Sequence, residues 1–567
     1  MAHDVVIKNG TVIDGSGSPA FQADVAIDGE KISAIGKDLG GGKKEIDAKG
    51  HVVAPGFIDS HTHMDAFVVQ YPNGNPVVNY GVTSIVIGDC GASCAPVPPQ
   101  PEPRKVLVAY LRRVLDKYVD DKDWHWNTFG EYLNYLEGKI AINCLPLMPH
   151  SPVRLTVMGE AAYQRAANPE ELQAMKAMVR EGMELGAIGF STSPRGGPAI
   201  HAGTPSTFAE HDEIIELANV AAEFNGCFQF NGFQMILQPE SGVPEMLTKI
   251  KGLQIGNEFR VRPGAKAAGM QSIRYMEEAQ KRGQDICGVV IPYQHIRRFN
   301  LDDCFLFNGL PTWEAIKNSS DLKAKLKDKE TRRKIEQERI ACEGKLEFPE
   351  WHGWDRVVFE HLEKPELKKL EMKNVEEISR LTEKAPVDAF FDTWIEDNLN
   401  SAICYHGLAN AHPELLAEMI KSDTSLIGTD VGAHLDRFFW HGAPTKILGY
   451  WRREKNLMSL EQAVHKITGF PAKKLRLNRG LLKEGLPADV TIFDADKIDD
   501  LVSARLPDTV DANEVKRHPP GMKAVLAAMA QPLFRRKGGG SRIPIKIGGT
   551  WNKPTFGLDV KRVFGTG

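Results

Sequence analysis

The sequence predicts an α/β fold, a TIM-like (β/α)8 barrel with a small β-sandwich domain formed from both chain ends. Three observations lead to this prediction. Apolar runs that read as strands alternate with helical patterns through the middle of the chain, as in parallel barrels. One such run ends in the polar motif HTH, and barrels of this type carry their chemistry at the carboxyl ends of strands. Both chain ends instead show β-rich segments with turn signals.

The N-terminal segment reads as a small antiparallel β unit. Short β-rich runs between residues 4 and 52 are separated by NG and DG, which are typical of hairpin turns. A similar pattern returns near the other end in GLLKEGLPADVTIFDAD. We therefore expect one discontinuous β domain made of residues 1–53 and 472–530.

Residues 54–471 are predicted to form the barrel. The helix that starts at Pro169 is clearly marked, with Asn168 as its N-cap and Glu171 at the third position. Nine candidate strands compete for the eight places of the barrel, so one of them belongs elsewhere. The candidates are FIDSHTH, TSIVIGDCG, AINCLPLMPH, GAIGFSTSP, CFQFNGF, EFRVRPG, ICGVVIPY, SAICYHG and TSLIGTD.

Two further segments interrupt or extend this pattern. Long charged helices are predicted between about residues 296 and 395, as in SDLKAKLKDKETRRKIEQERI. Most of this charge is explained by solvated helix faces, but an insertion of this size between barrel strands is also a candidate lid. Residues 531–567 are basic and glycine-rich and form a C-terminal extension of unknown role.

Composition excludes several classes of protein. The 567 residues carry a formal net charge of −4, with 42% hydrophobic and 25% charged residues. These values are typical of a soluble globular protein and predict no nucleic-acid partner. No apolar run is long enough for a membrane span and no secretory signal opens the chain, so we expect a cytoplasmic protein. The eight scattered cysteines indicate reduced thiols and not a disulfide framework.

The stretch PGFIDSHTHMD contains the strongest candidate for a metal site. Side chains alternate along a strand, so His61 and His63 point the same way, with Cβ atoms roughly 7 Å apart. Two imidazoles at that spacing reach one ion. Taken alone, such a pair is more often structural, with both rings hydrogen-bonded to the backbone, so the choice depends on the rest of the sequence.

The order of several motifs resembles the amidohydrolase superfamily and, within it, the N-acyl-D-amino-acid deacylase (D-aminoacylase) branch. The resemblance runs from residue 4 to about residue 525. The motifs are VIKNGTVIDGSG, PGFIDSHTHMD, GVTSIVIGDCGASCAPV, NTFGEYLNYLEG, RLTVMGE, EGMELGAIGFSTS, GTDVGAHLD and KEGLPADVTIFDAD. The resemblance implies a metallo-hydrolase barrel that cleaves an amide with metal-activated water.

This resemblance also implies a ligand set. His61 and His63 match the family's first-strand ligands, and Cys90 matches its cysteine ligand after the second strand. Asp430 matches the last-strand aspartate, which would lie at the metal, accept the proton of the attacking water and deliver it to the leaving nitrogen. The implied metal is Zn²⁺, for which imidazole, thiolate and carboxylate are suitable ligands.

The sequence departs from the family at two expected metal histidines. Asn231 stands at the first position and Gly264 at the second. Glycine has no coordinating side chain, and a neutral amide is a poor zinc ligand. We therefore expect a single zinc ion. Four histidines that follow strand-like runs are alternatives as ligands or as pocket residues, namely His150, His201, His295 and His406, and we place His150 and His295 in the substrate pocket.

Substrate contacts are predicted from the same resemblance. Lys266 and Tyr293 fall where the family binds the carboxylate of an acyl-amino acid, for which a cation and a phenol are suitable. His434 follows the aspartate and could orient substrate or base. The family's arginine after the aspartate is replaced by His441, with Arg437 nearby.

The predicted function is hydrolysis of a linear amide C–N bond, most simply in an N-acyl-D-amino acid, by a metal-dependent enzyme with Asp430 as general base and acid. Hydrolysis of another amide, a cyclic imide or a lactone is an alternative, because fold and metal do not fix the scissile bond. A degenerate, metal-free barrel that acts as a binding protein is an alternative of another class. We expect a small-molecule amide substrate and a homo-oligomer.

Overall fold

A computed structural model describes most of the chain. The described residues are 2–75, 77–114, 119, 121–195, 201, 203–257, 266–299, 301, 304, 306–307, 310–341, 353–406, 410, 412–432, 441–498, 545–550 and 553–558. None of the helices in these ranges has the length and apolar character needed to cross a membrane.

The centre of the molecule is an eight-stranded parallel sheet, which confirms the predicted barrel. Its strand order is β17-β12-β11-β10-β9-β8-β7-β6. The two edge strands meet through a parallel bridge between Thr62 and Val431 and through a hydrogen bond from the Asp430 amide to the His61 carbonyl (3.0 Å). The strands are β6 (Phe57–Asp59), β7 (Val82–Ile87), β8 (Asn143–Pro149), β9 (Gly189–Thr192), β10 (Cys227–Phe230), β11 (Gln254–Gly256), β12 (Ile286–Val290) and β17 (Ser425–Ile427).

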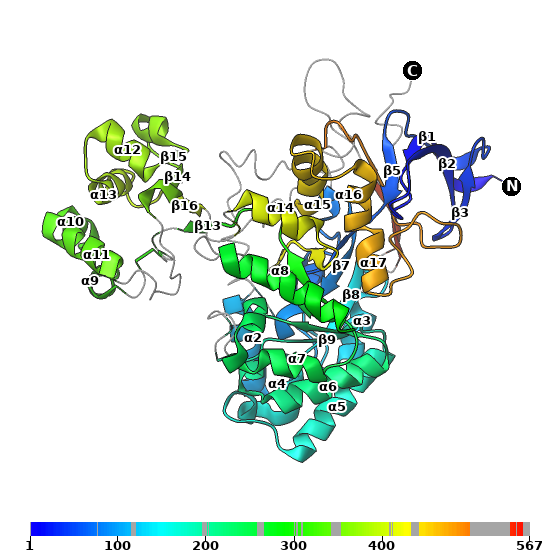
Figure 1. Cartoon of the computed structure of the whole chain (residues 1–567), viewed down its shortest axis with the longest axis horizontal. Coiled ribbons are helices and arrows are strands. Elements are labelled where there is room, and N and C mark those ends of the chain that lie inside the picture. Colours follow the sequence, from blue (N-terminus) through cyan, green and yellow to red (C-terminus); the bar gives the residue numbers. More distant parts are fainter. Residues whose placement is uncertain are drawn as a thin grey trace.

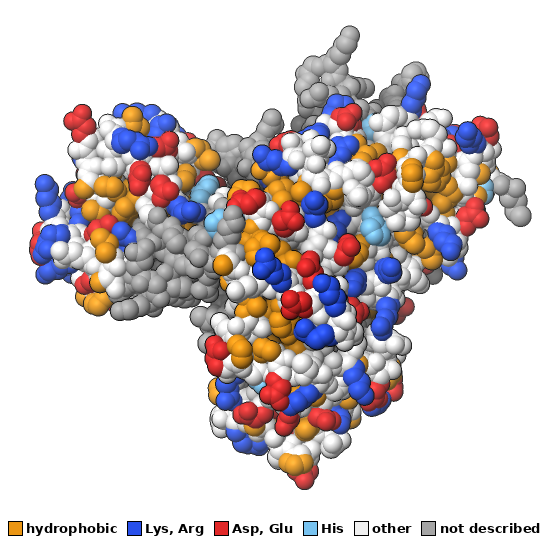
Figure 2. Space-filling model, in the orientation of Figure 1, with side chains coloured by type: hydrophobic (Ala, Val, Ile, Leu, Met, Phe, Trp, Pro, Cys, Tyr) orange, Lys and Arg blue, Asp and Glu red, His pale blue; other side chains and the backbone are white. Residues whose placement is uncertain are grey.

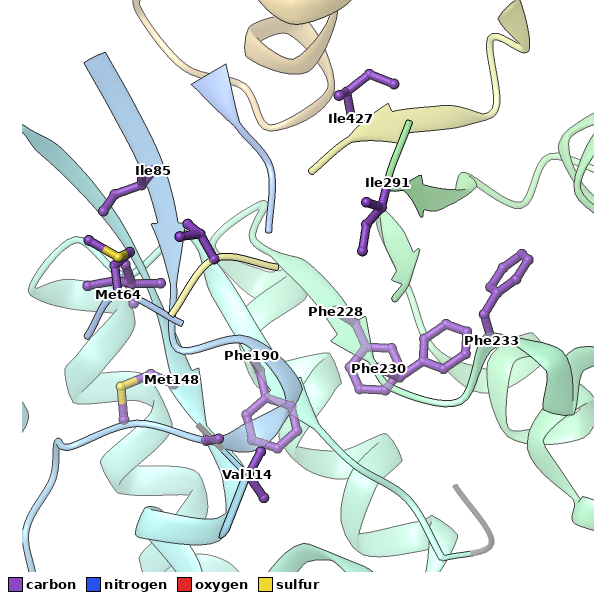
Figure 3. Close-up of a cluster of buried hydrophobic side chains, with 14 of the residues drawn as sticks. Met64, Ile85, Val114, Met148, Phe190, Phe228, Phe230, Phe233, Ile291 and Ile427 are labelled. Carbon is purple, nitrogen blue, oxygen red and sulfur yellow. The ribbon is translucent and has the colours of Figure 1, made fainter. Parts of the chain in front are cut away.

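Side-chain alternation gives these strands an inner and an outer face. On β10, Phe228 and Phe230 point outward and stack with ring centroids 5.7 Å apart, and Phe190 of β9 lies beside them (Figure 3). Cys227 points the other way and packs inside the barrel with Ile255 of β11. The same alternation directs Gln229 inward, one step closer to the carboxyl ends of the strands.

Helices pack around the outside of the barrel (Figure 1). The predicted helix at Pro169 is α5, and Asn168 forms the expected capping box with Glu171. The helices along the barrel sequence are α1 (Phe67–Gln70), α2 (Pro101–Val114), α3 (Phe129–Leu136), α4 (His150–Met158), α5 (Pro169–Glu184), α6 (His211–Glu223), α7 (Val243–Lys249), α8 (Lys266–Lys281), α14 (Pro413–Lys421), α15 (Ala443–Lys446), α16 (Leu460–Ile467) and α17 (Gly469–Lys474).

Both chain ends contribute to one six-stranded sheet, as the sequence predicts. Strand β18 from the late segment pairs antiparallel with β5, next to β1, β2 and β3, while β4 pairs in parallel with β1 along the same edge as β5, opposite β2. The apolar side chains of this sheet form a core of their own. The strands are β1 (His3–Val12), β2 (Phe21–Asp28), β3 (Lys31–Gly36), β4 (Gly42–Asp47), β5 (Val52–Pro55) and β18 (Val490–Phe493).

A separate lobe lies between β12 and β17 and projects from the barrel (Figure 1). Its four-stranded sheet has the order β13-β16-β14-β15, and Trp313, Phe390 and Trp394 are central to its own apolar core. Acidic and basic side chains are interspersed over its surface (Figure 2). Its elements are β13 (Ile296–Phe299), α9 (Pro311–Ile316), α10 (Leu322–Lys327), α11 (Lys329–Ala341), β14 (Val357–His361), β15 (Lys373–Asn374), α12 (Val375–Thr382), α13 (Pro386–Glu396) and β16 (Ala402–His406).

This lobe explains the surplus strand candidate. SAICYHG forms β16, which pairs antiparallel with β13 and β14 and not with the barrel. The candidate EFRVRPG lies outside the described residues, and the sixth barrel strand is β11 just before it. In the C-terminal extension, β19 (Ile545–Thr550) and β20 (Lys553–Leu558) form a two-stranded sheet.

Candidate metal centre

His61 and His63 lie directly after β6, at the carboxyl end of the barrel. The end of this strand is tied to β17 by Asp59, whose carboxylate accepts hydrogen bonds from the amide and hydroxyl of Thr429 and from the amide of His61 (3.2 Å). The two imidazole rings are buried, with centroids 5.2 Å apart and planes at 81°. Both rings are therefore held in place before any ligand arrives.

Cys90 reaches these rings from the end of β7. It sits in the turn Asp89–Gly91 with φ of 57°, in the left-handed region that non-glycine residues seldom occupy. Its sulfur lies 3.9 Å from Nε2 of His61. One ligand atom from each of His61, His63 and Cys90 can be chosen so that all three lie within 4.8 Å of one another. Among the described residues, this is the group of side chains that could hold a metal ion.

Asp430 completes the cluster from β17. One oxygen, Oδ1, lies 3.2 Å from Nε2 of His61 and 3.3 Å from Nε2 of His63. Asp430 also has a left-handed backbone, with φ of 56°. Behind His61, Gly428 leaves so little space that an added Cβ would lie 2.8 Å from the Cβ of His61. The four side chains predicted from the sequence as ligands are thus neighbours in the fold.

Asp89, the residue before Cys90, is a further member of the site that was not predicted from the sequence. Its carboxylate oxygen lies 3.4 Å from Nδ1 of His61 and is fully buried. A carboxylate behind a metal-binding imidazole fixes the ring's orientation and increases its basicity. The neighbouring GDCG motif could have drawn attention to it, because the acid adjoins a predicted ligand.

Electrostatic interactions lower the pKa values of the two acidic members of the cluster, Asp430 and Cys90. Burial alone would raise the pKa of Asp430, but hydrogen bonds and charge interactions with His61 and His63 outweigh it and hold that pKa well below its ordinary value. Burial likewise opposes ionisation of Cys90, yet the same two histidines lower the pKa of its thiol. In return, burial lowers the pKa of His63 but Asp430 and Cys90 raise it to about 10.

The residues present fit a zinc ion. They supply two imidazoles, a sulfur and a carboxylate, which is a suitable zinc ligand set. Their donor atoms converge, because Oδ1 of Asp430 lies 3.2 and 3.3 Å from Nε2 of the two imidazoles and the Cys90 sulfur lies 3.9 Å from Nε2 of His61. Without an ion, a cluster of this kind has to be held together by protons on the imidazoles, which a metal cation would replace.

The structure describes only some of the side chains that were predicted to bind the substrate. Tyr293 and His295 follow β12 and are buried, and the Nζ of Lys446 lies 5.4 Å from the centroid of the Tyr293 ring. Lys266 is the first residue of α8, and its side chain is outside the described part. His434 and Arg437 lie outside the described residues.

His150 is fully buried in a network between the end of β9 and helix α6. Its Nδ1 lies 2.8 Å from Oγ1 of Thr192, and its Nε2 lies 2.8 Å from Oε1 of Glu213. Arg154 also pairs with Glu213. Both ring nitrogens of His150 are therefore engaged by the protein.

Two inward-facing side-chain amides contact Cys90, and a third lies at the end of β10. Gln229 of β10 accepts a hydrogen bond from the Cys90 amide (2.9 Å), and Asn257, which follows β11, donates from Nδ2 to the Cys90 sulfur (3.3 Å). Asn231 is also buried, and its Oδ1 accepts a hydrogen bond from the amide of Gly232. Gly264 lies outside the described residues. Neither Gln229 nor Asn257 was predicted: Gln229 lies in the predicted strand CFQFNGF but belongs to no recognisable motif, and Asn257 follows β11, which lies just before the predicted strand EFRVRPG.

Comparison with known proteins identifies relatives over most of the chain. The profile of the amidohydrolase family matches residues 44–285 and 352–522. An N-acyl-D-aspartate deacylase of Alcaligenes xylosoxydans xylosoxydans is 30% identical over 512 residues, which cover 89% of this chain and 88% of the relative. A D-aminoacylase of the same organism is 28% identical, covering 89% and 90%.

Solved structures support the same fold. The crystal structure of a D-aminoacylase superposes with a TM-score of 0.60 at 24% identity and covers 88% of this chain and 91% of that one. The N-acyl-D-glutamate deacylase of Bordetella bronchiseptica, complexed with zinc and a phosphonate inhibitor, also gives 0.60, at 22% identity and 88% and 92% coverage. The resemblance predicted from the sequence is confirmed. Taken together, the barrel, the buried histidine pair and the extent of these matches show that the chain belongs to the amidohydrolase family, and within it the chain is similar to N-acyl-D-amino-acid deacylases.

Proposed function

We propose that the protein is a metal-dependent hydrolase of a linear amide, with an N-acyl-D-amino acid as its substrate. The observation that carries this proposal is the buried cluster of His61, His63, Cys90 and Asp430 at the carboxyl end of the barrel. Relatives named as deacylases of N-acyl-D-aspartate and N-acyl-D-glutamate support the choice of substrate class.

The proposed centre holds one zinc ion through these four residues. A bound zinc ion would supply Lewis-acid activation of a water molecule and of the scissile carbonyl. At the two positions where the family resemblance implies further metal histidines, this chain has Asn231, a neutral amide, and Gly264, which has no coordinating side chain. The proposal is therefore a single ion.

Asp430 is proposed as the group that moves the proton. Its low pKa keeps the carboxylate ready to accept a proton, and Oδ1 lies within hydrogen-bonding range of both imidazoles. As the tetrahedral intermediate collapses, the same oxygen would return the proton to the leaving nitrogen, so that an amine and a carboxylate are released. Burial of the cluster keeps bulk water from competing for this proton.

Recognition of the substrate carboxylate is assigned to the residues predicted from the family resemblance, Lys266 and Tyr293, with His434 and Arg437 after the catalytic aspartate. The position of Tyr293 supports this assignment, because Val290 pairs with Ile427 and Tyr293 and Asp430 each follow three residues later. The Nζ of Lys446 adds a positive charge near the Tyr293 ring. His295 is buried just beyond Tyr293 and is proposed as a further wall of the pocket.

For His150 we propose a role different from the substrate contact predicted from the sequence. Because both of its ring nitrogens contact protein groups, we propose that it supports the pocket wall and does not touch the substrate.

A second candidate is hydrolysis of another amide, a cyclic imide or a lactone. The departures from the family pattern at Asn231 and Gly264 favour this candidate over a strict D-aminoacylase. A metal-free binding protein is the alternative of another class. The homo-oligomer and the cytoplasmic location remain predictions.

Elemental analysis of protein purified without added metal, followed by a hydrolysis assay, tests the proposal. The assay would compare N-acetyl-D-aspartate, N-acetyl-D-glutamate, neutral N-acetyl-D-amino acids, their L forms, a hydantoin and a lactone. We expect about one zinc per chain, lost in a His61→Ala/His63→Ala variant, and turnover of the D substrates that fails in that variant. His406→Ala is the control, because His406 lies in the projecting lobe.

Protein that holds no metal and takes up none on adding zinc would refute the proposed mechanism and favour the binding-protein alternative. Metal retention with turnover of only the hydantoin or the lactone would favour the second candidate.

A further inference from the structure

The backbone around Cys90 is held by side chains from two neighbouring barrel strands, β9 and β10. Its amide donates to Oε1 of Gln229 on β10 (2.9 Å), and its carbonyl accepts from Oγ of Ser193, just after β9 (2.7 Å). The next amide, that of Gly91, donates to Oγ of Ser191 (3.0 Å). These bonds hold a left-handed backbone that a cysteine does not adopt readily. The direction of the sulfur is thereby fixed.

The sulfur itself has a hydrogen-bond donor that the catalytic scheme does not use. Nδ2 of Asn257 lies 3.3 Å from it, and Asn257 is fully buried at the end of β11. Inward direction of this side chain follows from alternation, because Ile255, two residues earlier, packs inside the barrel. A thiolate can only accept hydrogen bonds, so the NH2 end of the amide has to face it.

We propose that Asn257 is a positioning residue of the metal centre, which donates an N–H···S hydrogen bond to the Cys90 thiolate and thereby weakens that sulfur as an electron donor to the metal. The inference rests on the proposed metal centre and adds to it. Hydrogen bonds around a ligating atom tune a metal site without touching the metal. A sulfur that donates less charge leaves the ion a stronger Lewis acid toward water and the substrate carbonyl.

The full-length protein loaded with Co²⁺ in place of zinc gives a direct readout. A thiolate bound to Co²⁺ shows a sulfur-to-cobalt charge-transfer absorption band, whose energy falls as the sulfur becomes more electron-rich. We expect this band in the wild type and its loss in Cys90→Ser. In Asn257→Leu, which keeps a similar volume without a donor, the band should move to longer wavelength. Asn257→Ala removes the donor without adding volume and covers the case in which leucine prevents folding.

Asn231→Leu is the matched control, because Asn231 is an equally buried amide after the neighbouring strand β10 and bonds to Gly232. A shift in the Asn257 variants that is absent from this control supports the inference. A band at the wild-type position in both Asn257 variants would overturn it and leave the proposed centre intact. A band that is missing in the wild type, or that survives in Cys90→Ser, would instead overturn ligation by Cys90 and the inference with it.

Discussion

Replacing Glu213 with glutamine should destabilise the barrel strongly, although Glu213 belongs to no metal ligand set. Burial would raise the pKa of this carboxyl, but hydrogen bonds and charge interactions with His150 and Arg154 lower it from 4.5 to about 2. A change of one pKa unit corresponds to about 1.4 kcal/mol, so the ionised Glu213 contributes about 3 kcal/mol at neutral pH. Glutamine also leaves the buried guanidinium of Arg154 without its counter-ion.

The pH dependence has a definite sign. A carboxyl with a depressed pKa in the folded protein stabilises it above the unfolded pKa, and this contribution is lost as the pH falls from 4.5 to about 2. Urea unfolding followed by tryptophan fluorescence should therefore show a lower midpoint for Glu213→Gln at pH 7 and a shrinking difference from wild type in acid. Glu216→Gln is the control, because Glu216 lies on the same helix in an exposed pair with Lys176. Equal midpoints for the two variants would refute the reasoning.

Three further predictions concern the metal centre. Asp430→Asn should keep the fold and lower kcat by about 10² to 10⁴, and a kcat within tenfold of wild type, measured at equal zinc content, would contradict its role as base. Gly428→Ala places a methyl group 2.8 Å from Cβ of His61 and 2.7 Å from Cγ1 of Val289, which costs about 1–3 kcal/mol in overpacking. We expect this variant to bind less zinc, because the methyl group displaces His61. Unchanged zinc affinity would contradict this prediction. Because the pKa of His63 without metal is about 10, zinc binding at neutral pH releases its proton. Zinc affinity, measured by competition with a chelator, should therefore rise about tenfold per pH unit for each proton released. An affinity that does not depend on pH would contradict a protonated His63 paired with Asp430 and Cys90.

Local motifs determined much of what could be predicted. The apolar run before His61 and the polar residues after it placed a ligand pair at the end of a strand, which is where the structure has it. The Asn168 and Glu171 pattern gave the start of α5 because helix capping depends on residues only three apart. Turn signals at both ends predicted strands that share one sheet. In these cases the physical cause lies within a few residues of sequence.

Other features depended on contacts between distant segments. SAICYHG has the pattern of a barrel strand, and only pairing with β13 and β14 assigns it to the projecting lobe. The side chains that hold Cys90 come from residues more than 100 positions away, such as Gln229 and Asn257.

The sequence by itself was enough to predict the family, the barrel and the residues of the candidate metal centre, because these follow from local motifs and their order along the chain. Only the tertiary structure decided which amides face the sulfur of Cys90 and which carboxylate lies behind His61. The physical reason is that a shift of one residue along a strand turns each side chain to the opposite face of the sheet, and that register is fixed by packing across the whole barrel.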